Sequence, residues 1–208
     1  MLKRSLLLTV LTLILSILGL ATVAADGPIE GRAGRAEVRF LEGMIDHHQM
    51  AIDMANDCLA KATTESVVTT CQSIIDAQSA EIATMQEWLL NWYNIAYTPI
   101  PMSEMMDMTG DEMHGMDHAM EGMPATDPAL MMGMFAGFNR LEGVEYEIAW
   151  VEAMVDHHDD AIHMSERLLA RNPEGTGHAE LRALAQKIIT DQTAEIEQME
   201  TMLTELAS

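Results

Sequence analysis

Basic residues are scarce in this chain of 208 residues. Lysine and arginine together number 11, against 33 aspartates and glutamates, and the formal net charge at pH 7 is −22. A polyanion of this kind repels DNA, RNA and anionic lipid, so we expect neither nucleic acid nor a membrane surface as a partner. The excess of carboxylates instead attracts cations.

Aromatic residues make up only 4% of the chain, whereas methionine accounts for 20 residues. The sequence therefore uses a soft, polarizable thioether where leucine or phenylalanine would pack as well. The balance of 49% hydrophobic and 21% charged residues allows one sizeable buried core and does not indicate disorder along the whole length.

Long apolar runs are absent except at the N-terminus. Lys3 and Arg4 precede an apolar run over residues 6–21, and Val23, Ala24 and Ala25 are the small residues that a signal peptidase accepts. We predict a cleaved signal peptide over residues 1–25 and an exported chain over 26–208, periplasmic or otherwise extracytoplasmic. An uncleaved N-terminal anchor is the alternative, because the run is nearly long enough to span a membrane. No cysteine lies near the cleavage site, so the sequence does not indicate a lipoprotein.

The rest of the chain contains an internal repeat. The segment Met44-Ile45-Asp46-His47-His48 recurs as Met154-Val155-Asp156-His157-His158, at an offset of 110 residues. A second segment containing Ala80-Glu81-Ile82 and Met85 recurs as Ala194-Glu195-Ile196 and Met199, at an offset of 114. The four extra residues belong in the turn at 171–177 of the second copy.

Each copy reads as two helices, because apolar residues recur every three or four positions. We predict helices near 36–61, 66–95, 140–170 and 179–206, and a further short helix opened by Asp127 and Pro128. The hairpins, about 36–97 and 138–207, should pack as one ferritin-like four-helix bundle of the all-α class, with a long crossover over about 98–135.

Cys58 and Cys71 are the only cysteines. Each lies about a turn and a half of helix from the first hairpin bend, so they face one another across it. A disulfide, two buried thiols and a pair of thiol ligands all remain open. Export favours the disulfide.

The inward stripes of the four predicted helices carry polar and sulfur-containing side chains. Inward glutamates need a partner, so we expect Glu81 and Glu195 to accept hydrogen bonds from imidazoles and leave the other ring nitrogens for a metal. A polar network that only fixes helix register, with methionines as core filler, is the structural alternative. His163 lies on the outer face, outside the set. The candidate metal ligands on the helices are Met44, His47, His48, Met50, Met54, Met85, Met154, His157, His158, Met164 and Met199.

The predicted crossover adds a second group of candidate ligands. The crossover is too rich in glycine and acidic residues to form an apolar face, so its methionines should be accessible. Clustered accessible thioethers interleaved with histidine suit Cu(I), although a low-complexity linker without a ligand role is the alternative. The candidates here are Met113, His114, Met116, His118, Met120 and Met123.

The string from Phe40 through Met44-Ile45-Asp46-His47-His48 to Ala55, with its second copy, resembles the domain-of-unknown-function family 305 and, within it, the copper-binding CopM-like proteins of bacterial periplasms. The resemblance covers residues 35–206. It implies a ferritin-like fold and binding of Cu(I) or Ag(I) through methionine and histidine. Asp160 stands where the first copy has Met50, which is a departure from the repeat.

We therefore expect an exported protein that sequesters or carries Cu(I) or Ag(I) in copper homeostasis or resistance. It should be no enzyme, have no organic cofactor, and pass its metal to a partner protein. One alternative is a metal-dependent ferritin-like oxidase, although neither the second nor the fourth predicted helix has the Glu-x-x-His motif of di-iron sites. The other is a metal-free structural adaptor of the cell envelope.

Overall fold

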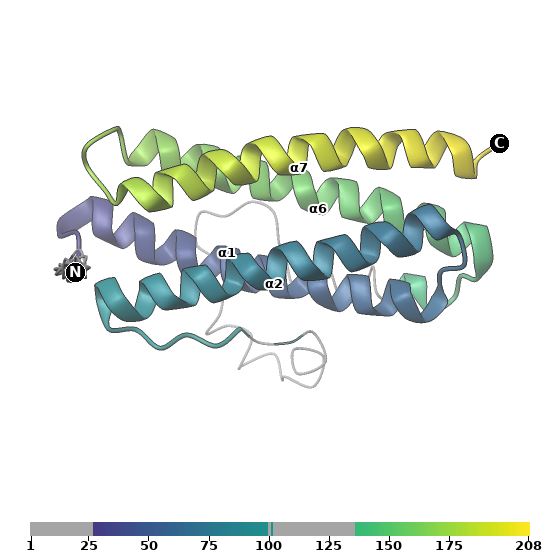
Figure 1. The fold of residues 1–208 in the computed structure, drawn as a ribbon, viewed down its shortest axis with the longest axis horizontal. Coiled ribbons are helices and arrows are strands. Elements are labelled where there is room, and N and C mark those ends of the chain that lie inside the picture. The colour runs from purple at the N-terminus through teal and green to yellow at the C-terminus, as the bar shows by residue number, and fades with distance from the viewer. Residues whose placement is uncertain (1–26, 100, 102–135) are drawn as a thin grey trace, which may run out of the picture.

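Four long helices form two antiparallel hairpins in this computed structural model, which describes residues 27–99, 101 and 136–208. In chain order they are α1 (Gly31–Lys61), α2 (Glu65–Tyr93), α6 (Gly143–Arg171) and α7 (Ala179–Leu206). Helix α1 packs along α2, α6 packs along α7, and the hairpins meet mainly through α1 and α6 (Figure 1). The predicted all-α bundle of two duplicated hairpins is confirmed.

The helix ends differ from the predicted ones by a few residues. Helix α1 begins at Gly31 rather than near residue 36, because its first turns are rich in arginine and glycine and show no apolar periodicity. Helix α2 ends at Tyr93 rather than at 95, because Asn94 adopts a left-handed conformation with φ of 56°. Asparagine tolerates this conformation, which stops the helix. Helix α6 begins at Gly143, three residues after the predicted start.

Some of the sequence-based predictions fall on residues 1–26, 100 and 102–135, outside the described residues. These are the signal peptide over 1–25, the ligand candidates of the crossover and the short helix at Asp127 and Pro128. None of the helices in the described part of the chain is long and apolar enough to cross a membrane.

A disulfide joins Cys58 of α1 to Cys71 of α2, with the Cα atoms 6.3 Å apart. The predicted bridge is therefore confirmed, and the alternatives of buried thiols and of thiol ligands are wrong. At the equivalent position of the second hairpin, Leu168 and Ala185 are buried and belong to one apolar cluster. Packing there takes the place of the covalent link.

Two buried glutamates at equivalent repeat positions clamp the hairpins together. Glu147 of α6 accepts hydrogen bonds from the backbone nitrogens of Thr63 and Thr64, at 2.7 and 2.9 Å, where α2 begins. Glu37 of α1 accepts bonds from the backbone nitrogen and the ring Nδ1 of His178, at 2.8 and 2.6 Å, where α7 begins. Each first helix thus satisfies the free N–H groups that open the second helix of the other hairpin.

The hydrogen bonds of Glu37 also explain a glycine in the turn between α6 and α7. A Cβ atom at Gly177 would lie 2.2 Å from Oε1 of Glu37, so a larger residue would displace the carboxylate from its hydrogen bonds. Sequence analysis did not identify either clamp. The signal was nevertheless present, since Glu37 and Glu147 differ by the same 110 residues as the histidine pairs.

Candidate metal centre

Four buried imidazoles lie in one layer where α1 crosses α6. The rings of His47 and His157 are the central pair, with centroids 3.7 Å apart and planes inclined by 37°. His48 and His158 flank them, each with its centroid 6.3 Å from that of its sequence neighbour. All four residues are at most 3% exposed. The inward placement predicted for both histidine pairs is confirmed, and the structure joins the two pairs into one cluster.

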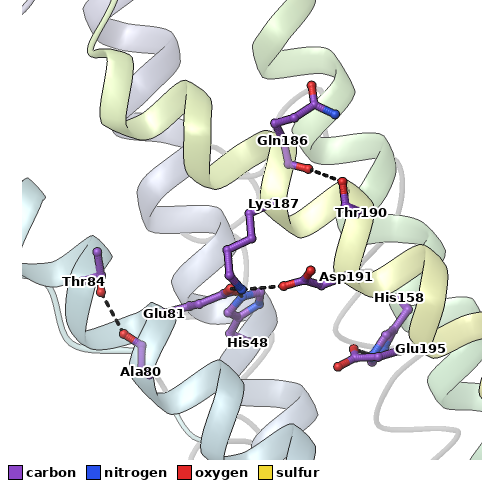
Figure 2. Close-up of polar contacts among 10 residues, drawn as sticks. All are labelled: His48, Ala80, Glu81, Thr84, His158, Gln186, Lys187, Thr190, Asp191 and Glu195. Atoms are coloured by element: carbon purple, nitrogen blue, oxygen red, sulfur yellow. Dashed lines mark hydrogen bonds and ion pairs between the residues drawn. The ribbon is translucent and has the colours of Figure 1, made fainter.

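Each outer imidazole is held by a glutamate from the second helix of its own hairpin. Nε2 of His48 lies 2.8 Å from Oε2 of Glu81, and Nε2 of His158 lies 2.8 Å from Oε2 of Glu195. Figure 2 shows both contacts. An ionised carboxylate only accepts hydrogen bonds, so Nε2 carries the ring proton and Nδ1 keeps a lone pair. The predicted histidine–glutamate pairs are therefore confirmed, and they fix the tautomer in the way that second-shell carboxylates do.

The two carboxylates are not equivalent. Nζ of Lys187, from α7, donates to Oε1 of Glu81 at 3.0 Å and also reaches Asp191 (Figure 2). Burial raises the pKa of Glu81, but the hydrogen bonds from His48 and Lys187 outweigh it and hold the pKa below its ordinary value. The repeat places Ser73 at the position equivalent to Lys187, so Glu195 receives no lysine there.

Six ring nitrogens of the cluster are buried without a hydrogen-bond partner. They are Nδ1 and Nε2 of His47 and of His157, and Nδ1 of His48 and of His158. Burial, and then the neighbouring imidazoles, lower the pKa of His47 and His157 well below the ordinary value, and a weak contact of each central ring with the backbone of the other histidine offsets this only in part. The central rings are therefore neutral at physiological pH, and each has a lone pair available to a metal ion.

Buried glutamines add to this unpaired polar surface. Both amide atoms of Gln78 and Oε1 of Gln192 are also buried without a partner. The two residues are equivalent in the repeat, and they lie on the helices that carry Glu81 and Glu195. Buried polar atoms are nearly always paired in native proteins, so such a concentration at one level calls for a specific cause.

Methionines flank the imidazole layer in two groups. One apolar cluster contains Met44 and Met85 of the first hairpin and Met164 of the second. The other contains Met154 and Met199 of the second hairpin, with Met54 and Met50 of the first. Along α1, the two histidines lie between Met44 and Met54, and α6 repeats this order. All the helical methionines proposed as ligands are thus buried, and the repeat exchanges the two groups.

Among the described residues, no three His, Cys, Asp or Glu side chains are arranged to hold a metal ion. Methionine is not among these four residue types, and its thioether sulfur favours soft ions. The donor set at this level is neutral nitrogen and sulfur, with carboxylates behind the imidazoles. Such a set fits a soft monovalent cation better than a hard one.

Two other histidines do not belong to the cluster. His163 has a side chain that is 55% exposed, and its ring Nδ1 contacts the carbonyl of Asp159. This is the outer position predicted for it. His178 is buried, but it pairs with Glu37 and stacks on Trp92 at 3.7 Å between ring centroids. Its ring is therefore structural, and sequence analysis did not single it out.

Comparison with known proteins identifies the fold. Residues 37–203 match the model of a family described as a domain of unknown function, DUF305. A DUF305 protein from Streptomyces coelicolor, whose name describes it as a predicted secreted protein, is 24% identical with a TM-score of 0.63, and the match covers 83% of this chain and 93% of that one. No curated protein sequence matches.

Solved structures of CopM are also similar. The Cu(I)-bound form is 24% identical, covering 83% of this chain and 98% of that one, with a TM-score of 0.60. The Cu(II)-bound form is 28% identical, covering 80% and 94%, with a TM-score of 0.57. An Ag-bound form of CopM is similar as well, at 24% identity and a TM-score of 0.57, covering 81% and 96%. The family match spans most of the chain and the hairpin architecture agrees, so this protein belongs to the DUF305 family.

Proposed function

We propose that this protein binds Cu(I) or Ag(I) outside the cytoplasm and sequesters or carries the ion, without catalysing a reaction. The observation that carries the proposal is the set of six unpaired imidazole nitrogens buried between two groups of methionines. A purely structural layer would pair these atoms or replace them with apolar side chains. Each ring, with a proton on one nitrogen, leaves one lone pair on the other, and such a lone pair is what a metal ion requires.

The chemistry of the donors selects the ion. Thioether sulfur and neutral imidazole are soft or borderline ligands and prefer Cu(I) over Mg²⁺ or Ca²⁺. A cation buried at this level also needs compensating negative charge. Glu81 and Glu195 supply it one hydrogen bond away, through the imidazoles of His48 and His158. The arrangement keeps carboxylate oxygen out of direct contact with the ion and still neutralises its charge.

The relatives and the rest of the chain support the same function. CopM, a distant structural relative, has been solved with Cu(I), Cu(II) and Ag. The Met- and His-rich segment over residues 102–123 would capture ions from solution, and the net charge of −22 would raise the local concentration of cations. From there the buried centre would receive the ion, and a partner protein would take it on.

An extracytoplasmic location is part of the proposal. The bridge between Cys58 and Cys71 is typical of oxidising compartments and is rare in the cytosol. Together with the predicted signal segment over residues 1–25, it supports a periplasmic or extracytoplasmic protein released by cleavage.

An anaerobic competition titration tests the metal function. The mature protein would be titrated with Cu(I) in the presence of a chromophoric Cu(I) chelator, beside a variant with His47, His48, His157 and His158 all replaced by alanine. We expect the variant to lose at least one Cu(I) equivalent or to bind that equivalent at least about tenfold more weakly, about 1.4 kcal/mol. His163→Ala is the matched control, since that ring is exposed and outside the cluster.

The same experiment separates the two parts of the molecule. A second variant would replace the methionines of 102–123 with leucine. Unchanged stoichiometry in that variant would remove the crossover from the proposal, and unchanged binding by the quadruple variant would remove the buried centre. In a separate aerobic assay, oxygen consumption that the protein catalyses on addition of Cu(I) or Fe(II) would point to an oxidase. A melting temperature that Ag(I) does not move would favour a metal-free adaptor, because a ligand that prefers the native state must stabilise it.

A further inference from the structure

Four arginines converge at one end of the bundle. Arg32, Arg35 and Arg39 lie at positions i, i+3 and i+7 of α1, which places them on one face of the helix. Arg171 is the last residue of α6, which runs antiparallel to α1 and ends beside its start (Figure 1). With Ala36, the four arginines line a surface cavity of about 400 Å³. This is within the size range of small-ligand sites.

All the charged side chains that line this cavity are positive. No acidic side chain lines it, and within the described residues none of the four arginines forms an ion pair. Arg167, one turn before Arg171, has Nη2 buried without a hydrogen-bond partner. Burial and then the charge of Arg171 lower the pKa of the Arg167 guanidinium, and Asp160 offsets this only in part. In a chain with 33 acidic residues and 11 basic ones, such a cluster needs a cause.

A second cavity adjoins the first. It has a volume of about 350 Å³ and shares Arg35 and Arg39 with the arginine cavity. Its other walls include the acidic residue Glu30 beside the less polar residues Pro28, Ile29, Val38 and Tyr93. A ligand whose charged group contacts the arginines therefore has space beside it with apolar walls and one carboxylate, which favours the uncharged or cationic part of such a molecule there.

We propose that the cavity formed by Arg32, Arg35, Arg39 and Arg171 binds a phosphate-bearing anion of several negative charges, of the size of a di- or triphosphate group. The planar guanidinium donates two parallel hydrogen bonds to phosphate oxygens, and four such groups match an anion with several charged oxygens. The net charge of −22 does not prevent binding, because at physiological ionic strength charges farther than about 8 Å are largely screened. This site lies apart from the histidine cluster and does not depend on the metal function.

Calorimetric titration of the metal-free mature protein with sodium tripolyphosphate tests the proposal. We expect saturable binding, and a rise in Tm of about 3–6 °C at ten times the dissociation constant. The variant R35Q/R39Q should bind at least about tenfold more weakly. The control is K61Q/R140Q, which removes two positive charges outside the cavity and should bind within about twofold of the unmodified protein.

Sedimentation with vesicles distinguishes the source of the phosphate. Vesicles of phosphatidylcholine with one third phosphatidylglycerol would be compared with phosphatidylcholine alone. Binding of tripolyphosphate alone, lost in R35Q/R39Q, supports a free phosphate compound, and vesicle binding lost in the same variant supports a lipid headgroup. The proposal is overturned if neither probe binds at millimolar concentration, if both variants weaken binding equally, or if polyglutamate binds more tightly than tripolyphosphate.

Discussion

Replacing the central histidines with leucine should stabilise the metal-free protein while abolishing its response to Ag(I). His47 and His157 bury four ring nitrogens that have no hydrogen-bond partner. A buried unpaired polar group costs about 1–3 kcal/mol. We take about 1–2 kcal/mol per ring, since stacking of the two imidazoles recovers part of it. Leucine is close to histidine in volume and introduces no polar atom. The double variant H47L/H157L should therefore gain about 2–4 kcal/mol, or about 5–15 °C in Tm.

Thermal melting at pH 7.5 with the disulfide intact measures this gain. The metal-free unmodified protein should melt below H47L/H157L, and an excess of Ag(I) should raise only the Tm of the former. H163L is the control for general effects of removing a histidine, and its Tm should stay within about 1 °C because the side chain is exposed. If metal-free H47L/H157L melts below the unmodified protein, the central rings stabilise the bundle and the reasoning from unpaired nitrogens is refuted.

Three further predictions concern stability. The metal-free protein should lose stability as the pH falls below about 6.5, because the unfolded chain takes up protons that buried His47 and His157 do not. The loss should reach up to about 1.4 kcal/mol per pH unit for each central histidine. Urea titrations at pH 7.5, 6.5 and 5.5 should show this slope, and a flat profile would contradict it. Glu147→Ala leaves two backbone N–H groups unpaired at the start of α2 and should lower the free energy of unfolding by about 3 kcal/mol, measured as a lower urea midpoint. The control is Glu145→Ala on the exposed side of α6, which should lower it by less than about 0.5 kcal/mol. Reducing the bridge between Cys58 and Cys71 should lower the free energy of unfolding by about 3 kcal/mol, as expected for a closed loop of this length; an unchanged midpoint after reduction would show that packing alone closes this turn.

Much of the fold was predictable because the sequence contains two copies of the same helical hairpin. The offsets of 110 and 114 residues identified the two hairpins, and the apolar periodicity identified the inward faces that carry His47, His48, His157 and His158. Periodicity could not give the helix ends, which depend on single backbone conformations. Asn94 and Gly143, for example, adopt left-handed values of φ of 56° and 57°.

The candidate site was predictable by residue but not by arrangement. Helix faces indicated that Glu81 and Glu195 would meet histidines, and they do. That His47 stacks on His157 depends on where α1 crosses α6, and a contact between segments 110 residues apart cannot be derived from either segment alone. The contact between Lys187 and Glu81 could not be derived for the same reason, because it joins α7 to α2 across the two hairpins.

The two hairpins face each other through equivalent positions of the repeat, as His47 and His157 show by stacking on one another. A homodimer of either hairpin would build a similar layer, with every feature duplicated by necessity. Covalent fusion removes this constraint, because a substitution in one half no longer appears in the other. Lys187 opposite Ser73 is such a difference, and the disulfide of the first hairpin is another. The two halves of the proposed metal centre could therefore differ in binding strength, and a bound ion would then have a preferred side.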